Sequence, residues 1–293
     1  MKITFLGTGC MQPTVKRNHS SILLSHNREN LLFDCGEGTQ RQMRFAKVKP
    51  ARITKIFISH WHGDHCFGIP GLMSAMGADN FEGTLEIYGP KGSKTYLKHM
   101  LKGFARKDMI TYKIKEVSKG TIVNADNFII EAHQLKHSVS CVGYSFKEKD
   151  KLRIDVKKAT KLGLKGEILG RLQKGKNVTL KGKKIMFKDV TYKVKGKKIS
   201  YIADTVKCLG ARKLAKDCDL LISEATHCDD VVKRKYMHLT VREACEIAKA
   251  GKAKRLVLTH ISQRYKDSKA VLKEAKKYFK KVQVAEDFLE IKI

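Results

Sequence analysis

Three histidines and one aspartate stand within six residues, directly after a short apolar run. Residues 56–65 read Ile-Phe-Ile-Ser-His-Trp-His-Gly-Asp-His, so a buried strand would deliver His60, His62, Asp64 and His65 on a tight loop. Imidazole nitrogen and carboxylate oxygen are ligands of borderline metals such as zinc. An aspartate and a histidine behind the H-x-H pair can serve a second ion. The chain is therefore expected to build a metal site at the end of a strand.

Strands and helices are expected to alternate along the chain. Short apolar, β-branched runs bounded by Gly, Asn, Asp or Pro predict buried strands. Helical periodicity marks Thr240–Lys249, where Thr240 and Glu243 form a capping box, and Asp267–Lys280. This mixture predicts an α/β fold with sheets covered by helices. The expected strands are Ile3–Leu6, Ser21–Leu24, Leu31–Phe33, Ile53–Ile58, Thr84–Tyr88, Phe128–Ala132, Val142–Phe146, Ile199–Ala203, Leu220–Ile222, Leu256–Leu258 and Phe288–Ile293.

Further ligand candidates recur just past the carboxyl end of an expected strand. Asp34, Asp204 and His260 each follow an apolar run directly, and His137 stands four residues beyond a strand that ends near His133. Each of these residues, taken singly, has an alternative reading as a capping aspartate or a core histidine. Gathered at one edge of the sheets, they predict a shared site.

Net charge separates one segment from the rest of the chain. The 293 residues carry 60 Lys and Arg against 29 Asp and Glu, a formal charge of +31. Lys147–Lys198 holds 19 of those basic residues against 5 acidic ones, is punctuated by glycine and has few aromatics. We expect it to bury little and to form an insertion. It reads either as a solvated insert or as a basic arm that binds phosphate backbone.

The eight cysteines indicate buried free thiols in a reducing compartment, because no two of them form a C-x-x-C pair. The apolar start of the chain breaks at Gly7-Thr8-Gly9, before a signal peptide could form. No apolar stretch approaches the length of about 18 residues that spans a membrane. A soluble, intracellular protein is expected.

Several motifs surround the H-x-H-x-D-H run and together resemble one family. They are Gly7-Thr8-Gly9, the P-x-x-x-R-N loop of Pro13–Asn18, Asp34-Cys-Gly-Glu-Gly38, Gly68-Ile-Pro-Gly71, His137-Ser138 with Gly143-Tyr144, Asp204-Thr205 and Thr259-His-Ile-Ser-Gln-Arg-Tyr265. Over nearly its whole length the chain resembles the metallo-β-lactamase superfamily and, within it, the ribonuclease Z family of tRNA 3′-processing endonucleases. The resemblance implies an αββα sandwich with a dinuclear site on one edge.

The resemblance also implies the domain organisation. Residues 1–293 would form a single metallo-β-lactamase-fold domain, with residues 147–198 as an inserted basic arm that binds tRNA. The Gly-Pro-rich tip that the family has in this arm is replaced here by a stretch without proline, Gly163-Leu-Lys-Gly166-Glu-Ile-Leu-Gly170. The resemblance predicts that the arm is present, but it does not predict how the arm folds in detail.

The ligand set follows from the resemblance, residue by residue. One zinc ion would be held by His60, His62 and His137, and a second by Asp64, His65 and His260. Asp204 would bridge the two ions, and Asp34 would lie behind them and orient a ligand imidazole. His137 is preferred to His133 because it carries the His-Ser and Gly-Tyr context. Mn²⁺ or Mg²⁺ are expected as substitutes for Zn²⁺.

Catalytic and substrate-binding roles are implied in the same way. Asp64 would take a proton from water, and His238, in the loop before Thr240–Lys249, would give one to the leaving 3′-oxygen. The alternative for His238 is an ordinary residue near a helix start. Arg17, Asn18 and the basic arm Lys147–Lys198 are expected to bind substrate. Ser223-Glu224-Ala-Thr stands where the family often has His-Glu-Ala-Thr, which leaves the role of the first position open.

The function implied is a zinc-dependent endoribonuclease that removes the 3′ trailer from precursor tRNA. It would leave a 3′-hydroxyl on the tRNA and a 5′-phosphate on the trailer, and it would act as a cytoplasmic homodimer. A phosphodiesterase of the same fold that acts on small phosphodiesters is the first alternative, because it would keep every ligand. A non-catalytic RNA-binding protein is the second.

Overall fold

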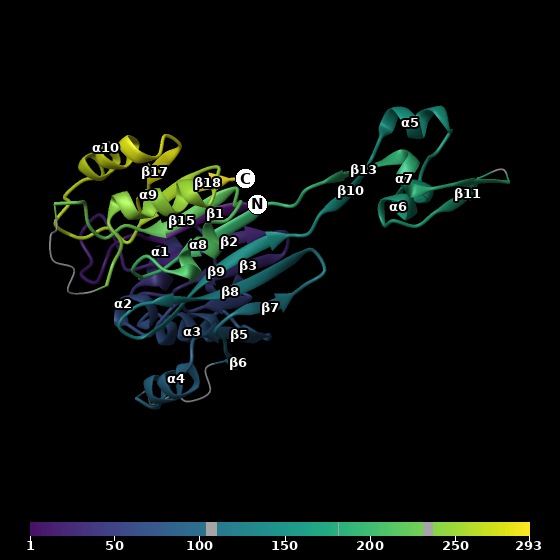
Figure 1. The fold of residues 1–293 in the computed structure, drawn as a ribbon. Coiled ribbons are helices and arrows are strands. Elements are labelled where there is room, and N and C mark those ends of the chain that lie inside the picture. Colours follow the sequence, from purple (N-terminus) through teal and green to yellow (C-terminus); the bar gives the residue numbers. More distant parts are fainter. Residues whose placement is uncertain (104–109, 181, 231–236) are drawn as a thin grey trace. The chain divides into compact units, whose positions relative to one another are not determined.

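The computed structural model describes residues 1–103, 110–180, 182–230 and 237–293. The chain divides into two compact units, both drawn in Figure 1. Residues 1–123, 130–146 and 198–293 form the first unit, and residues 124–129 and 147–197 form the second.

The first unit contains two sheets, and the first sheet has seven strands in the order β18-β1-β2-β3-β4-β5-β6. The pairs β18–β1, β1–β2 and β2–β3 are antiparallel, whereas β3, β4, β5 and β6 run parallel. The four parallel strands therefore end at the same edge. The strands are β1 (Lys2–Gly7), β2 (Ser21–His26), β3 (Glu29–Phe33), β4 (Lys55–Phe57), β5 (Thr84–Gly89), β6 (Thr111–Glu116) and β18 (Glu290–Lys292).

The second sheet also has seven strands, in the order β17-β16-β15-β14-β9-β8-β7. The strands β14, β15, β16 and β17 are parallel, so they too end at one edge. The strands are β7 (Gly120–Asn124), β8 (Phe128–Lys136), β9 (Ser140–Glu148), β14 (Lys198–Ile202), β15 (Leu220–Glu224), β16 (Leu256–Thr259) and β17 (Val282–Val284).

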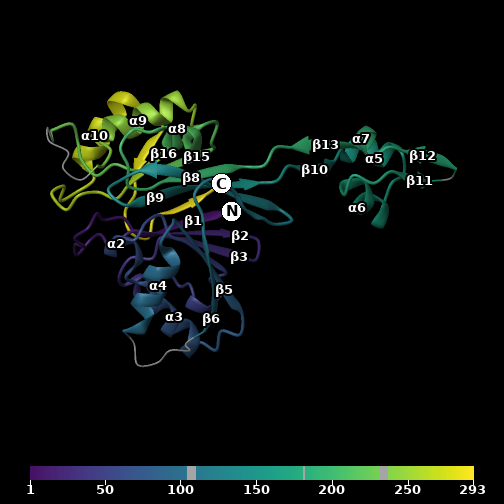
Figure 2. The same ribbon diagram turned by 60° about the horizontal axis from the view of Figure 1, so that its bottom comes forward.

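Helices cover the outer faces of the two sheets. In Figures 1 and 2, α3 and α4 lie beside the first sheet and α8, α9 and α10 beside the second. This arrangement confirms the α/β sandwich that the sequence predicts. The helices of this unit are α1 (Thr39–Phe45), η1 (Pro50–Arg52), α2 (Gly63–Cys66), α3 (Ile69–Ala78), α4 (Ser93–Lys102), α8 (Leu209–Ala215), α9 (Val241–Ala250) and α10 (Lys269–Tyr278).

Aromatic rings fill the space between the two sheets. Phe57 stacks on Phe33 and on Tyr88 of the neighbouring strands, with ring centroids 5.1 Å apart in both pairs. From the second sheet, Tyr144 packs on Phe57 at 5.4 Å and donates a hydrogen bond to the Ile58 carbonyl oxygen at 2.7 Å. The rings therefore fix the spacing of the strands whose ends carry the candidate site.

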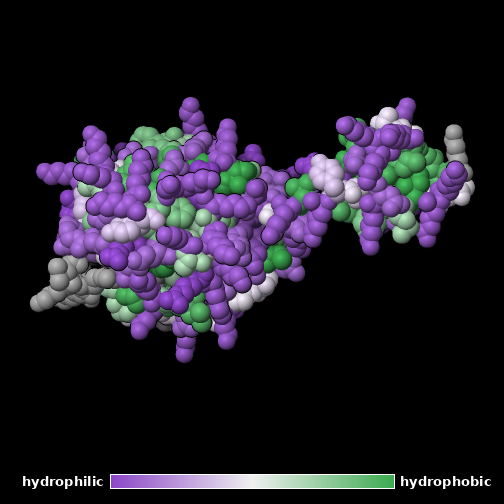
Figure 3. Space-filling model, turned by 45° about the horizontal axis from the view of Figure 1, so that its top comes forward, coloured by the Kyte–Doolittle hydropathy of each residue, from purple (hydrophilic) through white to green (hydrophobic). Residues whose placement is uncertain are grey.

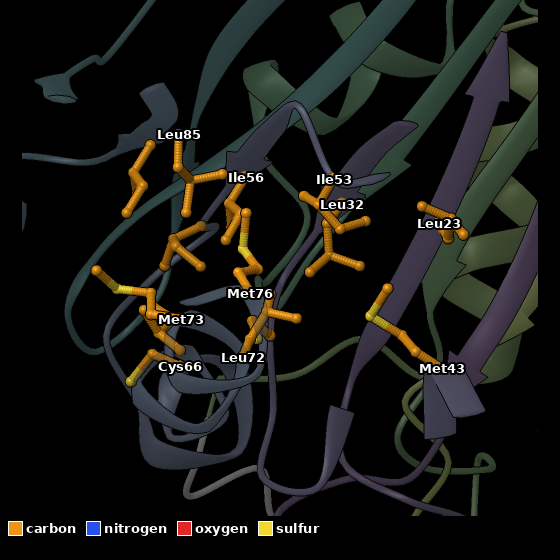
Figure 4. Packing of buried hydrophobic residues seen from close by; sticks show 14 of the residues in the cluster. Leu23, Leu32, Met43, Ile53, Ile56, Cys66, Leu72, Met73, Met76 and Leu85 are labelled. Atoms are coloured by element: carbon orange, nitrogen blue, oxygen red, sulfur yellow. The ribbon is translucent and has the colours of Figure 1, made fainter. Parts of the chain in front are cut away.

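A second buried layer joins the first sheet to α2 and α3. Figure 4 shows Leu32 and Ile56 of the sheet facing Leu72, Met73 and Met76 of α3. Each such side chain contributes about 1.5–3 kcal/mol through its removal from water. This packing anchors the segment that carries the H-x-H-x-D-H loop.

Several strand boundaries differ from the prediction. The run Ile53–Ile58 forms strand only at Lys55–Phe57, because Pro50 starts a 3₁₀ turn just before it. The last strand begins at Glu290 instead of Phe288, whose backbone has a positive φ of 70°. Strand β8 extends to Lys136, so His137 follows it directly.

The second unit folds around a small core of its own. Its strands are β10 (Lys151–Ile154), β11 (Val178–Leu180), β12 (Lys183–Ile185) and β13 (Thr191–Val194), and its helices are α5 (Val156–Lys161), α6 (Glu167–Gln173) and α7 (Phe187–Val190). Its buried residues are Ala159, Leu164, Leu172, Val178, Ile185 and Val190.

The segment buries few residues, as expected, but the sequence did not predict that these residues would form a core. The six buried residues are spread over residues 159–190, between stretches rich in lysine and glycine. Figure 3 shows hydrophilic side chains projecting from the unit with apolar residues between them. Within the predicted basic arm, Lys181 lies outside the described residues.

Two expectations about the chain as a whole can be compared with the structure. All eight cysteines are free, and only Cys10 and Cys208 are partly exposed. Among the described residues, no helix is long and apolar enough to cross a membrane.

Candidate metal centre

The strand ends bring distant parts of the sequence to one edge of the first unit. Asp34 follows β3 and His60 stands three residues after β4, while Asp204 stands two residues after β14 and His260 directly follows β16. His137 reaches the same place from the end of β8. Because parallel strands end at a common edge, these side chains meet although they are separated by up to about two hundred residues in the sequence.

The first ligand cluster consists of His60, His62, His137 and Asp204. The ligand atoms of these residues all lie within 4.8 Å of one another. His62 presents Nδ1, which is 3.1 Å from His60 Nε2 and 3.3 Å from His137 Nε2.

The second ligand cluster consists of Asp64, His65 and His260. His260 Nε2 lies 3.2 Å from His65 Nε2 and 3.3 Å from Asp64 Oδ2. Asp204 Oδ2 is 3.6 Å from both His60 Nε2 and His65 Nε2, so this carboxylate lies between the two clusters. The structure thus brings together all seven residues expected to bind metal.

Hydrogen bonds at the back of the rings leave one nitrogen of each free for a metal. The buried Asp34 carboxylate only accepts, so the His65 Nδ1 at 2.8 Å must carry the proton. Ser59 Oγ donates to the same carboxylate and therefore accepts from His60 Nδ1, at 2.9 Å. In both rings the Nε2 lone pair is left facing the clusters.

His137 and His260 are oriented in the same way. His137 Nδ1 lies 3.3 Å from the carbonyl oxygen of Met237, to which it donates. His260 Nδ1 lies 3.0 Å from Thr226 Oγ1, and the Thr226 hydroxyl in turn donates to Glu224 Oε2 at 2.7 Å. Each acceptor fixes the tautomer that presents Nε2 to the cluster.

The residues fit a pair of divalent cations. Burial lowers the pKa of His60, which keeps its imidazole neutral and able to bind metal. Burial alone would raise the pKa of Asp64 and Asp204, but the surrounding histidines hold both carboxyl groups well below their usual range. Asp204 Oδ1 is buried and has no hydrogen-bond partner among the described residues. A buried, ionised oxygen of this kind is satisfied by a cation.

The Asp34 carboxylate accepts hydrogen bonds from several of its neighbours. Besides His65, it accepts hydrogen bonds from the Ser59 backbone N–H at 2.7 Å and from the Tyr201 hydroxyl at 2.8 Å. The residue is fully buried, and its backbone adopts a positive φ of 57°. Such strain persists only where the surroundings hold it, here through hydrogen bonds from His65, Tyr201 and both the backbone N–H and the hydroxyl of Ser59.

A buried carboxylate beside His238 is the main feature that sequence reasoning left open. Glu224 Oε1 lies 3.3 Å from His238 Nδ1 and also accepts from the backbone N–H of Leu239 and of Thr205. Burial lowers the pKa of His238, but the carboxylates of Glu224 and Asp204 outweigh it and raise this pKa to about 9. The sequence does hold a signal, because a lone carboxylate at the end of an apolar strand is unusual.

Arg17, which was expected to bind substrate, makes several contacts inside the protein. Its guanidinium is buried and donates to Thr8 Oγ1, to the Ala285 carbonyl oxygen and to Ser268 Oγ at 2.6–2.8 Å. These bonds tie the P-x-x-x-R-N loop to the C-terminal segment, so the side chain is engaged inside the protein. Three of the five guanidinium N–H donors are therefore used inside the protein.

Asn18 also has internal partners. Its backbone N–H donates to Asp287 Oδ2 and its side-chain amide to the Glu37 carbonyl oxygen, both at 2.7 Å. The side chain is partly exposed. His133 lies within β8, next to Glu131 and outside both ligand clusters. The ring centroid of His227 lies 6.2 Å from that of His238.

Family models match both halves of the chain. A model described as anti-Pycsar protein Apyc1 matches residues 1–162, and one described as a beta-lactamase superfamily domain matches residues 186–261.

Full-length relatives are more specific. The chain is 40% identical to the ribonuclease Z of Methanothermobacter thermautotrophicus, covering 100% of this chain and 97% of that protein. It is 38% identical to the ribonuclease Z of Streptococcus equi, covering 99% of each. Among solved structures, human tRNase Z, short form, matches with a TM-score of 0.74 and 30% identity over 100% of this chain and 99% of that one. The metallo-beta-lactamase fold protein YhfI from Bacillus subtilis, at 22% identity and a TM-score of 0.71, shares the fold.

Proposed function

Because the chain belongs to the ribonuclease Z family, we propose that it is a metal-dependent endoribonuclease that removes the 3′ trailer of precursor tRNA. The observation that carries the proposal is the pair of ligand clusters joined by Asp204, with the hydrogen-bonded pair of His238 and Glu224 beside them. The site combines ligands for two cations with a proton donor. Two cations can stabilise the attacking and leaving oxygens of a phosphodiester, and a proton donor can protonate the leaving oxygen.

We propose two zinc ions per chain as the natural complement of the ligand clusters. One ion would be held by His60, His62 and His137. The other ion would be held by Asp64, His65 and His260, and Asp204 would bind both ions. Mn²⁺ or Mg²⁺ would be substitutes. Bound there, the ions would supply the positive charge that activates water and stabilises charge on the phosphate.

The residues of the chain have separate tasks in the proposed reaction. Attack by water on phosphorus breaks the bond to the tRNA 3′-oxygen, giving a tRNA 3′-hydroxyl and a trailer with a 5′-phosphate. Asp64 accepts the proton of the attacking water. His238 donates a proton to the leaving 3′-oxygen, and Glu224 keeps His238 oriented and protonated until then.

The second unit is proposed to hold the tRNA. The deep major groove of an A-form stem prevents readout by side chains, so recognition depends on shape and phosphates. Lys147–Lys198, with 19 basic residues against 5 acidic ones, has the charge for this task. We further propose a homodimer in which one subunit's arm binds the tRNA that the other cleaves, and an activity in the cytoplasm.

One assay tests the proposed function. Metal-loaded protein is incubated with a precursor tRNA that carries a 3′ trailer, and both product ends are mapped. We expect one cut, a 3′-hydroxyl on the tRNA and a 5′-phosphate on the trailer. Hydrolysis of small phosphodiesters without any cut in the precursor would favour the small-molecule phosphodiesterase instead. Binding of the precursor without hydrolysis of either substrate would favour a non-catalytic RNA-binding protein.

A further inference from the structure

Next to the metal centre along the first sheet lies the start of α4. Strands β3, β4 and β5 are parallel neighbours, and their carboxyl ends share one edge. The ends of β3 and β4 carry Asp34 and the H-x-H-x-D-H loop. The end of β5 carries the turn Pro90–Gly92 and then α4 (Ser93–Lys102). The start of α4 is therefore one strand away from the ligand loop.

Trp61 connects the ligand loop to α4. It stands between His60 and His62, but its ring packs on Tyr96 and on the hydrophobic core beneath the sheet. The indole Nε1 donates to Ser93 Oγ at 2.7 Å. The ring centroids of Trp61 and Tyr96 are 5.8 Å apart at an interplanar angle of 39°. We call these two rings the aromatic platform.

The aromatic platform is open to solvent on the side of Tyr96. Tyr96 is 52% exposed, which is far more than an aromatic side chain needs for packing alone. A third ring, Phe67, is 62% exposed and packs over the backbone of Gly63, inside the ligand loop. Two exposed rings, Tyr96 and Phe67, thus belong to elements that adjoin the ligand loop.

The surroundings of the aromatic platform are cationic. Lys91, Lys94, Lys98 and Lys102 are all exposed, and α4 itself contains no acidic residue. The neighbouring carboxylate, Glu116, is occupied at the start of the helix, where its Oε1 accepts from the backbone N–H of Gly92 and of Lys94. Exposed rings combined with lysines are typical of surfaces that bind single-stranded nucleic acid.

We infer that the aromatic platform and the lysines of α4 bind the single-stranded 3′ trailer of the substrate. A base of the trailer stacks on Tyr96, and the lysines neutralise its phosphates. This inference rests on the proposed function, since only a trailer-bearing RNA gives the platform an occupant. A paired stem hides the faces of its bases, whereas a trailer exposes them. Stacking tolerates any base, as variable trailers require.

The only tryptophan of the chain reports on the site, because it is Trp61 itself. A short single-stranded oligoribonucleotide is titrated into the full-length, metal-loaded protein while Trp61 fluorescence is recorded. We expect a saturable change in the parent protein. Tyr96→Ala should weaken oligonucleotide binding by about ten-fold or more, and Tyr96→Phe, which keeps the ring, should bind like the parent. In a second test, the double variant Lys94→Glu with Lys98→Glu keeps both rings and should also weaken oligonucleotide binding.

Cleavage assays then identify the occupant. Tyr96→Ala should raise the KM for a precursor with a trailer of roughly ten nucleotides and leave the KM for a one-nucleotide trailer unchanged. A parent-like KM for both precursors would overturn the inference, as would equal loss with both. If neither the parent nor the variant cut any precursor, the proposed function would fail. If the parent and Tyr96→Ala both cut the precursors and bound the oligonucleotide equally well, the proposed function would stand and only the inference about the aromatic platform would be refuted.

Discussion

Around the metal centre, each oriented histidine has its own hydrogen-bond acceptor, and this acceptor decides which nitrogen is left for a metal ion. Asp34, Ser59 and Thr226 serve His65, His60 and His260 in this way. Glu224 differs because its two oxygens serve two rings. One oxygen holds His238 directly, and the other accepts from the Thr226 hydroxyl that holds His260.

Glu224→Gln should lower the pKa of His238 below its value of about 9 in metal-free protein, because the main charge that raises it is removed. In the parent, the ion pair stabilises the folded state fully below the unfolded histidine pKa of about 6.5 and loses this contribution as pH rises through 9. The imidazole resonance of His238, followed by NMR across this range, measures the shift. Glu246→Gln, whose carboxylate pairs with Lys207 and Arg242, is the control. An unchanged titration in Glu224→Gln would remove the carboxylate from this role.

His238→Ala should slow single-turnover cleavage of precursor tRNA by a factor on the order of 10²–10⁴, which is typical of a lost general acid. Metal content and tRNA binding should stay close to those of the parent. His133→Ala, outside both clusters, is the matched histidine control. Loss of metal in His238→Ala would instead make His238 a ligand, in agreement with its place beside Asp204 and His260.

Asp204→Asn should disturb both ions, because Asp204 lies 3.6 Å from a histidine of each cluster. His260→Ala should empty mainly the second site. Elemental analysis of the purified proteins gives the number of zinc ions per chain, with two expected in the parent. Full activity of a parent protein stripped of metal and kept in chelator would end the metal proposal.

At the scale of elements, α9 illustrates how local sequence sets a helix start beside the site. Thr240 accepts from the Glu243 backbone N–H, and the Glu243 side chain accepts from the Thr240 backbone N–H, which is the predicted capping box. Two residues earlier stands His238. The cap therefore fixes the point at which the loop carrying His238 joins the helix.

Thr240→Ala should lower the free energy of unfolding by about 1 kcal/mol, since a backbone donor at the helix start loses its acceptor. Thr240→Ser, which keeps the hydroxyl, should stay near the parent. Urea denaturation followed by circular dichroism measures both variants. Equal stability of Thr240→Ala and Thr240→Ser would mean that the cap contributes nothing to the fold.

At the scale of the whole molecule, the most basic segment and the candidate metal ligands lie in different parts of the chain. All seven metal-ligand candidates belong to the first unit, and the segment richest in lysine forms most of the second. The second unit also has its own buried core. Removing it is therefore a change that the ligand clusters are expected to survive.

Replacement of residues 149–196 by a short Gly/Ser linker is designed from the structure. The retained ends are already joined, because the Glu148 backbone N–H donates to the Lys197 carbonyl oxygen at 2.8 Å. Lys198 is kept because it begins β14. Hydrolysis of bis-p-nitrophenyl phosphate should persist within a few-fold of the parent.

Affinity of this deletion variant for precursor tRNA should collapse, and its dependence on salt should flatten. Each lost phosphate contact removes roughly 0.7–0.9 from the slope of log K against log salt concentration. Filter binding at several salt concentrations measures both effects. A folded, metal-loaded variant that bound and cut precursor tRNA like the parent would show that the second unit is not needed for tRNA.

The sequence by itself determined the local parts of this protein. Apolar runs such as Leu220–Ile222 and Leu256–Leu258 form strands because they are buried on both faces and need no context to be recognised. The spacing of His60, His62, Asp64 and His65 predicts metal ligands without knowledge of the fold, because all four residues stand close together in one short stretch of the sequence.

Only the tertiary structure decided the contacts made across the sequence. Arg17 was expected to face substrate but is buried against Ala285, and Glu224 acquires its role from His238, fourteen residues away. The core of the second unit escaped prediction because its six buried residues are spread over residues 159–190, between stretches rich in lysine and glycine. A hydrogen-bond partner or a burial site depends on which strand ends meet at an edge, and that is a property of the assembled sheets, not of any one segment.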